Sequence, residues 1–177
     1  MRLFRFRKVH SDAKGSWRPG ALLLGALFLV FSRPAAAELP KQIILPLDLV
    51  LKMANAAMKK CDEGGHRVSV AVVDRSGVLR VLLRAGGAGS HTVNSSTKKA
   101  YTAASLGRPT SELANLVKDK PELQGMRDMD DQILLLGGGL PIKVGEELVG
   151  GIGVGGAPGA PLDEACAKAG VDALLEK

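Results

Sequence analysis

The chain has 177 residues, of which 46% are hydrophobic but only 3% aromatic. Its formal net charge of +6 comes entirely from residues 1–37, with seven Lys or Arg and one Asp, whereas residues 38–177 carry 17 basic and 17 acidic residues. Residues 38–177 therefore carry no net charge, and their one aromatic residue is Tyr101. Nucleic-acid binding needs clustered basic residues or aromatic rings that stack on bases, so we expect no nucleic-acid partner.

Residues 1–37 have the pattern of a cleaved secretory signal peptide. Basic residues within 2–8 precede an apolar run over 20–31, which is too short to span a bilayer. Three alanines then end at Ala37, where small residues suit signal peptidase. The sequence therefore predicts a periplasmic or secreted domain over 38–177, with no membrane span after cleavage. An uncleaved N-terminal anchor is the alternative.

Hydrophobic periodicity and turn residues divide this domain into helices and strands. In chain order we expect a helix over Leu45–Lys60, strands over Arg67–Asp74 and Val78–Arg84, a glycine-rich loop over Ala85–Gly89, helices over Ser90–Leu106 and from Thr110, an irregular stretch over Pro121–Asp131, strands over Gln132–Leu136, Leu140–Val144 and Glu147–Val154, and a helix over Leu162–Glu176. Strands joined by tight turns are antiparallel. The predicted fold class is α+β, a single domain with an antiparallel sheet of about five strands flanked by helices in the order α-β-β-α-α-β-β-β-α.

The domain has two cysteines, Cys61 near the end of the first predicted helix and Cys166 inside the last. An exported protein can form a disulfide between them only if the two Cα atoms come within about 7 Å. Two buried thiols that act as small hydrophobic residues are the alternative.

In the last predicted strand, residues with large side chains alternate with glycines. Its glycines, at 151, 153 and 155, fall on one face, and such a face lets another backbone approach closely. We expect the alanine-rich segments 100–105 and 165–169 to pack there, with a ligand on that face as the alternative. The segment 151–156 also satisfies G-x-G-x-x-G, but Pro158 and Pro161 follow it, so a dinucleotide site is rejected.

The most unusual segment runs from Arg84 to Arg108, where glycines precede a helix that begins with polar residues. A helix start offers free N–H groups and a positive dipole end, which suit a carboxylate. His91, Ser95, Lys98 and Thr102 fall along one helical stripe, and an imidazole with a lysine one or two turns away could hold iron or a carboxylated ligand. A capped polar turn with a solvated His91 is the alternative.

Several segments resemble the GlcG/HbpS-like family of haem-binding or haem-degrading proteins, which is related to the C-terminal domain of PduO. The matching segments are Ala71–Leu79, Arg84–Ala88, Lys99–Ala103, Leu136–Pro141 and Gly150–Gly170. Their order and spacing are specific, and the resemblance extends over roughly 45–171. One departure is the sequence Gly86-Gly87-Ala88, since many relatives have an acidic residue before the Gly-Ala pair.

The resemblance implies an α+β domain that forms homo-oligomers and often binds haem. Some relatives are linked to haem degradation or iron sensing, some to corrinoid metabolism, and some lie beside glycolate genes. We hypothesise an exported haem-binding protein that assists haem capture, sensing or degradation, without a dedicated catalytic residue. The alternatives are a non-catalytic oligomeric interaction module that partners a sensor or transporter, and a binder of a small carboxylate.

The family supplies no single axial ligand, so the site is predicted from this chain. We expect His91 to ligate the haem iron, with His66 as the fallback and Met126 or Met129 as a second ligand. Basic side chains near the helix start would hold the propionates. The candidate cofactor-binding residues are His91, Thr92, Ser95, Lys98, Lys99 and Arg84.

Overall fold

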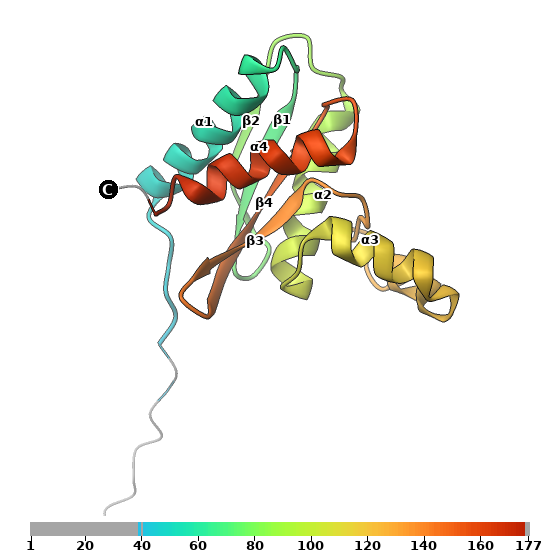
Figure 1. Ribbon diagram of the computed structural model, residues 1–177. Coiled ribbons are helices and arrows are strands. Elements are labelled where there is room, and N and C mark those ends of the chain that lie inside the picture. The colour runs from blue at the N-terminus through green and yellow to red at the C-terminus, as the bar shows by residue number, and fades with distance from the viewer. Residues whose placement is uncertain (1–38, 40, 176–177) are drawn as a thin grey trace, which may run out of the picture. The chain divides into compact units, whose positions relative to one another are not determined.

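The structure is a computed structural model that describes residue 39 and residues 41–175; the predicted signal peptide lies outside these residues. Its elements are α1 (Leu47–Glu63), β1 (Ser69–Asp74), β2 (Leu79–Arg84), α2 (His91–Leu106), α3 (Thr110–Asp119), the 3₁₀ helix η1 (Pro121–Asp128), β3 (Gly139–Val144), β4 (Glu147–Gly155) and α4 (Ala160–Asp172). The strands form one antiparallel sheet in the order β2-β1-β4-β3, which confirms the α+β class (Figure 1). No helix within the described ranges is long and apolar enough to cross a membrane.

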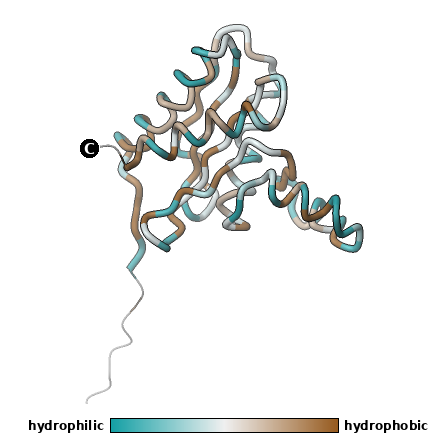
Figure 2. Tube along the Cα trace, viewed as in Figure 1, coloured by the Kyte–Doolittle hydropathy of each residue, from teal (hydrophilic) through white to brown (hydrophobic). Residues whose placement is uncertain are grey.

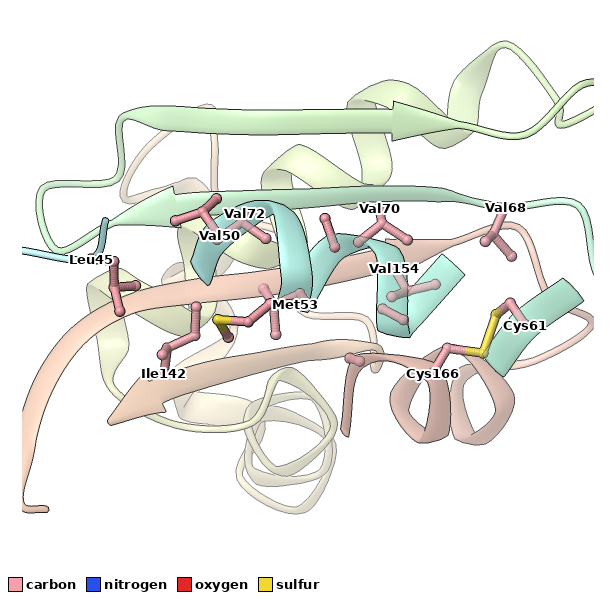
Figure 3. Packing of buried hydrophobic residues seen from close by; sticks show 14 of the residues in the cluster. Leu45, Val50, Met53, Cys61, Val68, Val70, Val72, Ile142, Val154 and Cys166 are labelled. Atoms are coloured by element: carbon pink, nitrogen blue, oxygen red, sulfur yellow. A yellow bond between two sulfur atoms is a disulfide. The ribbon is translucent and has the colours of Figure 1, made fainter. Parts of the chain in front are cut away.

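The sheet lies between two layers of helices. Val70 and Val72 of β1 belong to the main core, which α1 and α4 cover on one face (Figure 3). Ala71 and Val73 alternate with them and contact Ala100 of α2 on the other face. A central strand is therefore buried on both faces, which explains its nearly continuous run of valines.

Helix α2 packs unusually close to β4 because β4 is rich in glycine. A Cβ atom built on Gly153 would lie 2.1 Å from the carbonyl oxygen of Ser96 and 2.5 Å from the backbone nitrogen of Ala100. A Cβ atom on Gly151 would lie 2.3 Å from the Ala100 oxygen. The predicted packing on this face is confirmed for segment 100–105, but α4 covers the opposite face of the sheet.

The predicted strand over Gln132–Leu136 is wrong, and the sheet has four strands instead of about five. The apolar residues of this segment bury themselves against α3, where Leu135 packs with Leu113. The backbone of this segment is held by a side chain of α2 and not by a neighbouring strand: Leu134 N–H donates a hydrogen bond of 2.8 Å to Thr102 Oγ1. An apolar run alone cannot distinguish a strand from a loop that packs on a helix.

Helix α3 and η1 form a small satellite unit beside the sheet. In Figure 2, α3 alternates between hydrophobic and hydrophilic residues, as expected for a helix buried on one side. Leu113 and Val117 face its small core, and Leu123 and Met126 of η1 pack against them. The predicted irregular stretch is thus largely the 3₁₀ helix η1.

A disulfide joins Cys61 of α1 to Cys166 of α4, with 5.5 Å between the Cα atoms (Figure 3). The two helices lie on the same face of the sheet, and both cysteines are buried. This excludes the alternative of two free thiols.

Tyr101 fastens α2 to two loops. A Cβ atom on Gly77 would lie 2.6 Å from Tyr101 Cδ2, so the ring packs on the bare backbone of the β1–β2 turn. Its hydroxyl donates to Asp130 Oδ2 at 3.3 Å. Burial, and then the neighbouring Asp130 carboxylate, raise the pKa of Tyr101 above its ordinary value.

Candidate functional site

A cavity of about 280 Å³ opens where α2 and α4 begin, beside the end of β4. Three of the predicted site residues, His91, Ser95 and Lys99, line it from successive turns of α2. The remaining lining residues are Leu136, Gly155, Gly156, Ala157, Gly159, Ala160 and Asp163. We refer to this space as the α2–α4 cavity.

His91 is the first residue of α2, and its side chain is exposed. A Cβ atom on Gly89 would lie 2.6 Å from His91 Cε1 and 2.9 Å from Nδ1, so the ring rests on the backbone of the preceding loop. Within the described part of the chain the imidazole has no hydrogen-bond partner. An exposed, unpaired imidazole is free to bind a metal.

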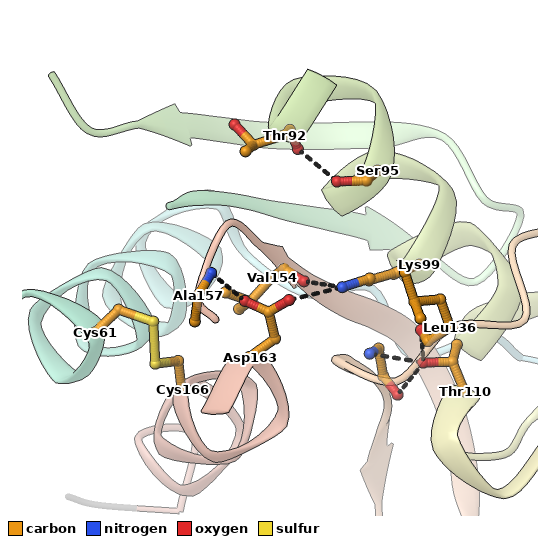
Figure 4. Close-up of polar contacts among 11 residues, drawn as sticks. Cys61, Thr92, Ser95, Lys99, Thr110, Leu136, Val154, Ala157, Asp163 and Cys166 are labelled. Carbon is orange, nitrogen blue, oxygen red and sulfur yellow. Dashed lines mark hydrogen bonds and ion pairs between the residues drawn. A yellow bond between two sulfur atoms is a disulfide. The ribbon is translucent and has the colours of Figure 1, made fainter. Parts of the chain in front are cut away.

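Lys99 and Asp163 form a buried ion pair in the α2–α4 cavity, with side chains only 3% and 5% exposed. Lys99 Nζ donates to Asp163 Oδ2 at 2.8 Å and to the carbonyl oxygen of Val154 at 2.9 Å (Figure 4). Asp163 Oδ1 accepts the N–H of Ala157 at 3.0 Å. The pair therefore fastens α2 to the end of β4, the loop that follows, and α4.

Ser95 and Thr92 lie about one turn apart on α2 but have different roles. Ser95 Oγ lines the α2–α4 cavity and makes a long bond of 3.3 Å to the Thr92 carbonyl. Thr92 is buried, and its Oγ1 donates to the Gly89 carbonyl and shares a 2.7 Å hydrogen bond with Ser69 Oγ. Thr92 thus holds the start of α2 against β1 and does not line the cavity.

Two of the predicted basic residues lie outside the α2–α4 cavity. Lys98 is partly buried on α2 and is absent from the cavity lining. Arg84 is exposed at the end of β2, and its guanidinium donates to the carbonyl of Ala88. Neither side chain therefore contributes to the wall of the cavity.

The other predicted iron ligands are also elsewhere. His66 lines a separate hollow of about 260 Å³ beside Cys166. Met126 packs in the satellite core of α3, and Met129 is 58% exposed just after η1. None of these three residues lines the α2–α4 cavity with His91.

A larger hollow of about 540 Å³ lies between α3 and α4. Ser111 and Leu140 line it together with Glu164, whose Oε2 is buried without a hydrogen-bond partner. Lys168 lines the same hollow one helical turn away and pairs with Asp172 instead. Lys168 lies four residues after Glu164, which is the spacing at which a lysine and a glutamate can pair on one helix face.

The sequence interpretation missed Asp163 as a member of the site. The available signal was a pair of opposite charges near apolar residues, since Lys99 is followed by Ala100, Ala103 and Ala104, and Asp163 lies in the first turn of an alanine-rich helix. Their separation of 64 residues along the chain hid the pairing. Buried charges are normally paired, so a lysine on an apolar helix face indicates an acidic partner.

Comparisons with known proteins agree with this architecture. The family model of the haem-degrading HbpS-like proteins matches residues 45–172. A double mutant of HbpS from Streptomyces reticuli is 41% identical, with a TM-score of 0.71 over 80% of this chain and 96% of that chain. Protein ORFY of Klebsiella pneumoniae is 29% identical, with a TM-score of 0.74 over 81% and 99%. A complex of PduOC with haem is 25% identical, with a TM-score of 0.69 over 74% and 95%.

Proposed function

Because the chain belongs to the HbpS-like family of haem-degrading proteins, we propose that it binds haem at the α2–α4 cavity, with His91 as the iron ligand. The observation that carries this assignment is an unpaired, exposed imidazole that shares a cavity with a buried lysine. The haem complex of the related PduOC supports the choice of ligand.

The residues present fit one edge of a haem. His91 supplies a nitrogen donor, and Leu136, which is 49% exposed, supplies apolar surface. The α2–α4 cavity, at about 280 Å³, is slightly smaller than the usual range of about 300–1,000 Å³ for ligand sites. The cavity would therefore hold only part of the haem, with His91 as the residue that would bind the iron.

The chain's own residues bind and orient the ligand. Haem, when bound, would supply an iron able to react with oxygen or peroxide. His91 would hold the iron, Gly89 would let the imidazole lie against the loop, and Thr92 would keep the start of α2 in place.

The disulfide supports export. Structural disulfides persist in oxidising compartments, and Cys61–Cys166 is a buried cross-link between two core helices. Together with the predicted signal peptide over 1–37, it favours a periplasmic or secreted protein that captures or buffers haem. Detection of the disulfide-bonded protein in a periplasmic or culture fraction would test this localisation.

Titration of the purified protein with hemin tests the iron ligand. We expect a Soret band that shifts on binding, and an affinity that falls by at least about tenfold, or 1.4 kcal/mol, in His91→Ala. His66→Ala should retain the wild-type spectrum, because His66 lines a different hollow. If His66→Ala weakens haem binding and His91→Ala does not, His66 is the iron ligand. If both variants keep the wild-type spectrum, neither histidine binds the iron.

The cavity volume favours a second candidate function, the binding of a small carboxylate. A ligand of a few heavy atoms fits wholly inside about 280 Å³, whereas haem does not. Thermal-shift comparison of small acids with hemin separates the two functions. Stabilisation by an acid alone would favour the second candidate.

A further inference from the structure

The ammonium group of Lys99 has one N–H more than the protein uses. A lysine ammonium carries three donors. In the part of the chain that the structure describes, two of them are bonded, to Asp163 Oδ2 and to the Val154 carbonyl. The third N–H therefore still needs an acceptor, and because Lys99 lines the α2–α4 cavity, a group bound there can supply it.

We propose that the α2–α4 cavity is a carboxylate-binding subsite in which Lys99 and Ser95 supply the recognising donors. Both residues line the cavity one turn apart on α2. In the described part of the chain Ser95 Oγ makes a single hydrogen bond, of 3.3 Å to the Thr92 carbonyl, and the hydroxyl can exchange this bond for one to a ligand. Two adjacent donors match the two oxygens of a carboxylate.

The electrostatics of the cavity favour an anion. Lys99 and Asp163 cancel each other's charge, so neither sign is favoured by the pair alone. Helices α2 and α4 both begin at the cavity, but the first turn of α4 already carries the Asp163 carboxylate, whereas the first turn of α2 has no acidic residue and no side-chain cap. The positive dipole end of α2 is therefore the one that favours an anion. Among the described residues the cavity lining includes no arginine, which favours a singly charged carboxylate over a phosphate.

This subsite deepens the proposed haem function and names the group that it recognises. The carboxylate belongs either to a haem propionate or to a free small acid. In the first case His91 and the propionate subsite act on the same molecule, since His91 and Lys99 are eight residues apart on α2, or about 12 Å along the helix axis. In the second case the acid binds without iron.

The decisive comparison uses hemin and hemin dimethyl ester, which lacks the free carboxylates. We expect the ester to bind about tenfold more weakly to the wild-type protein, a loss of 1.4 kcal/mol. In Ser95→Ala, and in Lys99→Met combined with Asp163→Asn, the preference for hemin over its ester should shrink to about twofold or less. The double substitution avoids leaving Asp163 as an unpaired buried charge.

Lys118→Met is the matched control, because it removes an exposed lysine at the end of α3 that does not line the cavity. It should keep the wild-type preference for hemin. Ser95→Ala keeps the test decisive if the double variant does not fold, since it removes only a partly buried hydroxyl.

Separate titrations with acetate, propionate and glycolate, followed by amide chemical shifts in the loop 155–159, test the subsite without iron. Shifts that disappear in Ser95→Ala support the carboxylate subsite even if hemin does not bind, in which case only the haem proposal fails. Equal binding of hemin and its ester, with no shift caused by any of the acids, would overturn the subsite and leave a water molecule as the missing acceptor. That result would leave the assignment of His91 intact.

Discussion

Reduction of the Cys61–Cys166 disulfide should remove a large share of the stability of this domain. The two cysteines are 105 residues apart, so the cross-link closes a long loop in the unfolded chain. The chain-entropy relation for a loop of that length gives about 4.7 kcal/mol at room temperature. A domain of this size has a free energy of unfolding of about 5–15 kcal/mol, so the reduced protein should be marginal at growth temperature.

Urea denaturation of oxidised and reduced protein measures this difference directly. The midpoint should fall on reduction, and the dependence on urea should steepen, because an unfolded chain without the cross-link exposes more surface. Cys61→Ala combined with Cys166→Ala should cost more than reduction, since it also removes two buried sulfur atoms from the core between α1 and α4.

A difference of less than about 1 kcal/mol between the oxidised and reduced proteins would refute this reasoning. It would mean that the unfolded chain already keeps α1 and α4 together, so that the cross-link restricts little. An unchanged dependence on urea would contradict the reasoning independently.

Three further predictions follow from the packing and the charges. Gly153→Ala should cost about 3 kcal/mol or more in urea unfolding because its Cβ would meet the α2 backbone, whereas Gly86→Ala, with nothing within 4 Å, should change stability by no more than about 1 kcal/mol. Lys99→Met alone should cost about 3–5 kcal/mol by leaving Asp163 unpaired, and adding Asp163→Asn should recover part of it. Because the pKa of Tyr101 is raised in the folded protein, the stability that its neutral phenol contributes should be present below about pH 10 and lost as the pH rises through the raised pKa. The ultraviolet absorbance of the tyrosinate follows this ionisation, and a midpoint at or below about pH 10 would contradict the prediction.

The fold was predictable where local patterns and tertiary packing agree. The valine-rich alternation of β1, the Gly-containing turn before β2 and the helical spacing of α1 each specify one structure. The segment Gln132–Leu136 failed because its apolar residues bury against α3 without joining the sheet. Whether an apolar segment joins a sheet or packs against a helix depends on residues that are distant in sequence, and the local pattern of residues does not reveal them.

The candidate site was predictable only in the part that lies on one element. His91, Ser95 and Lys99 come from a single helix, so helical spacing brings them to one side. Asp163 enters the site because α4 begins against the end of β4, where a Cβ atom on Gly138 would lie 2.7 Å from Asp163 Cβ. Sequence periodicity does not report such a contact.

The buried ion pair is poorly explained by stability alone. Two apolar residues of similar volume in place of Lys99 and Asp163 would often give an equally or more stable fold, because burying two charges costs about as much as their attraction returns. What an apolar pair could not provide is a fixed, charged donor that faces a cavity beside an unpaired imidazole. The pair also anchors Ala157, so it holds the glycine loop that forms the opposite wall. A rigid polar wall with one donor to spare is what recognition of an anion requires, so the proposed carboxylate subsite would account for a pair that packing does not explain.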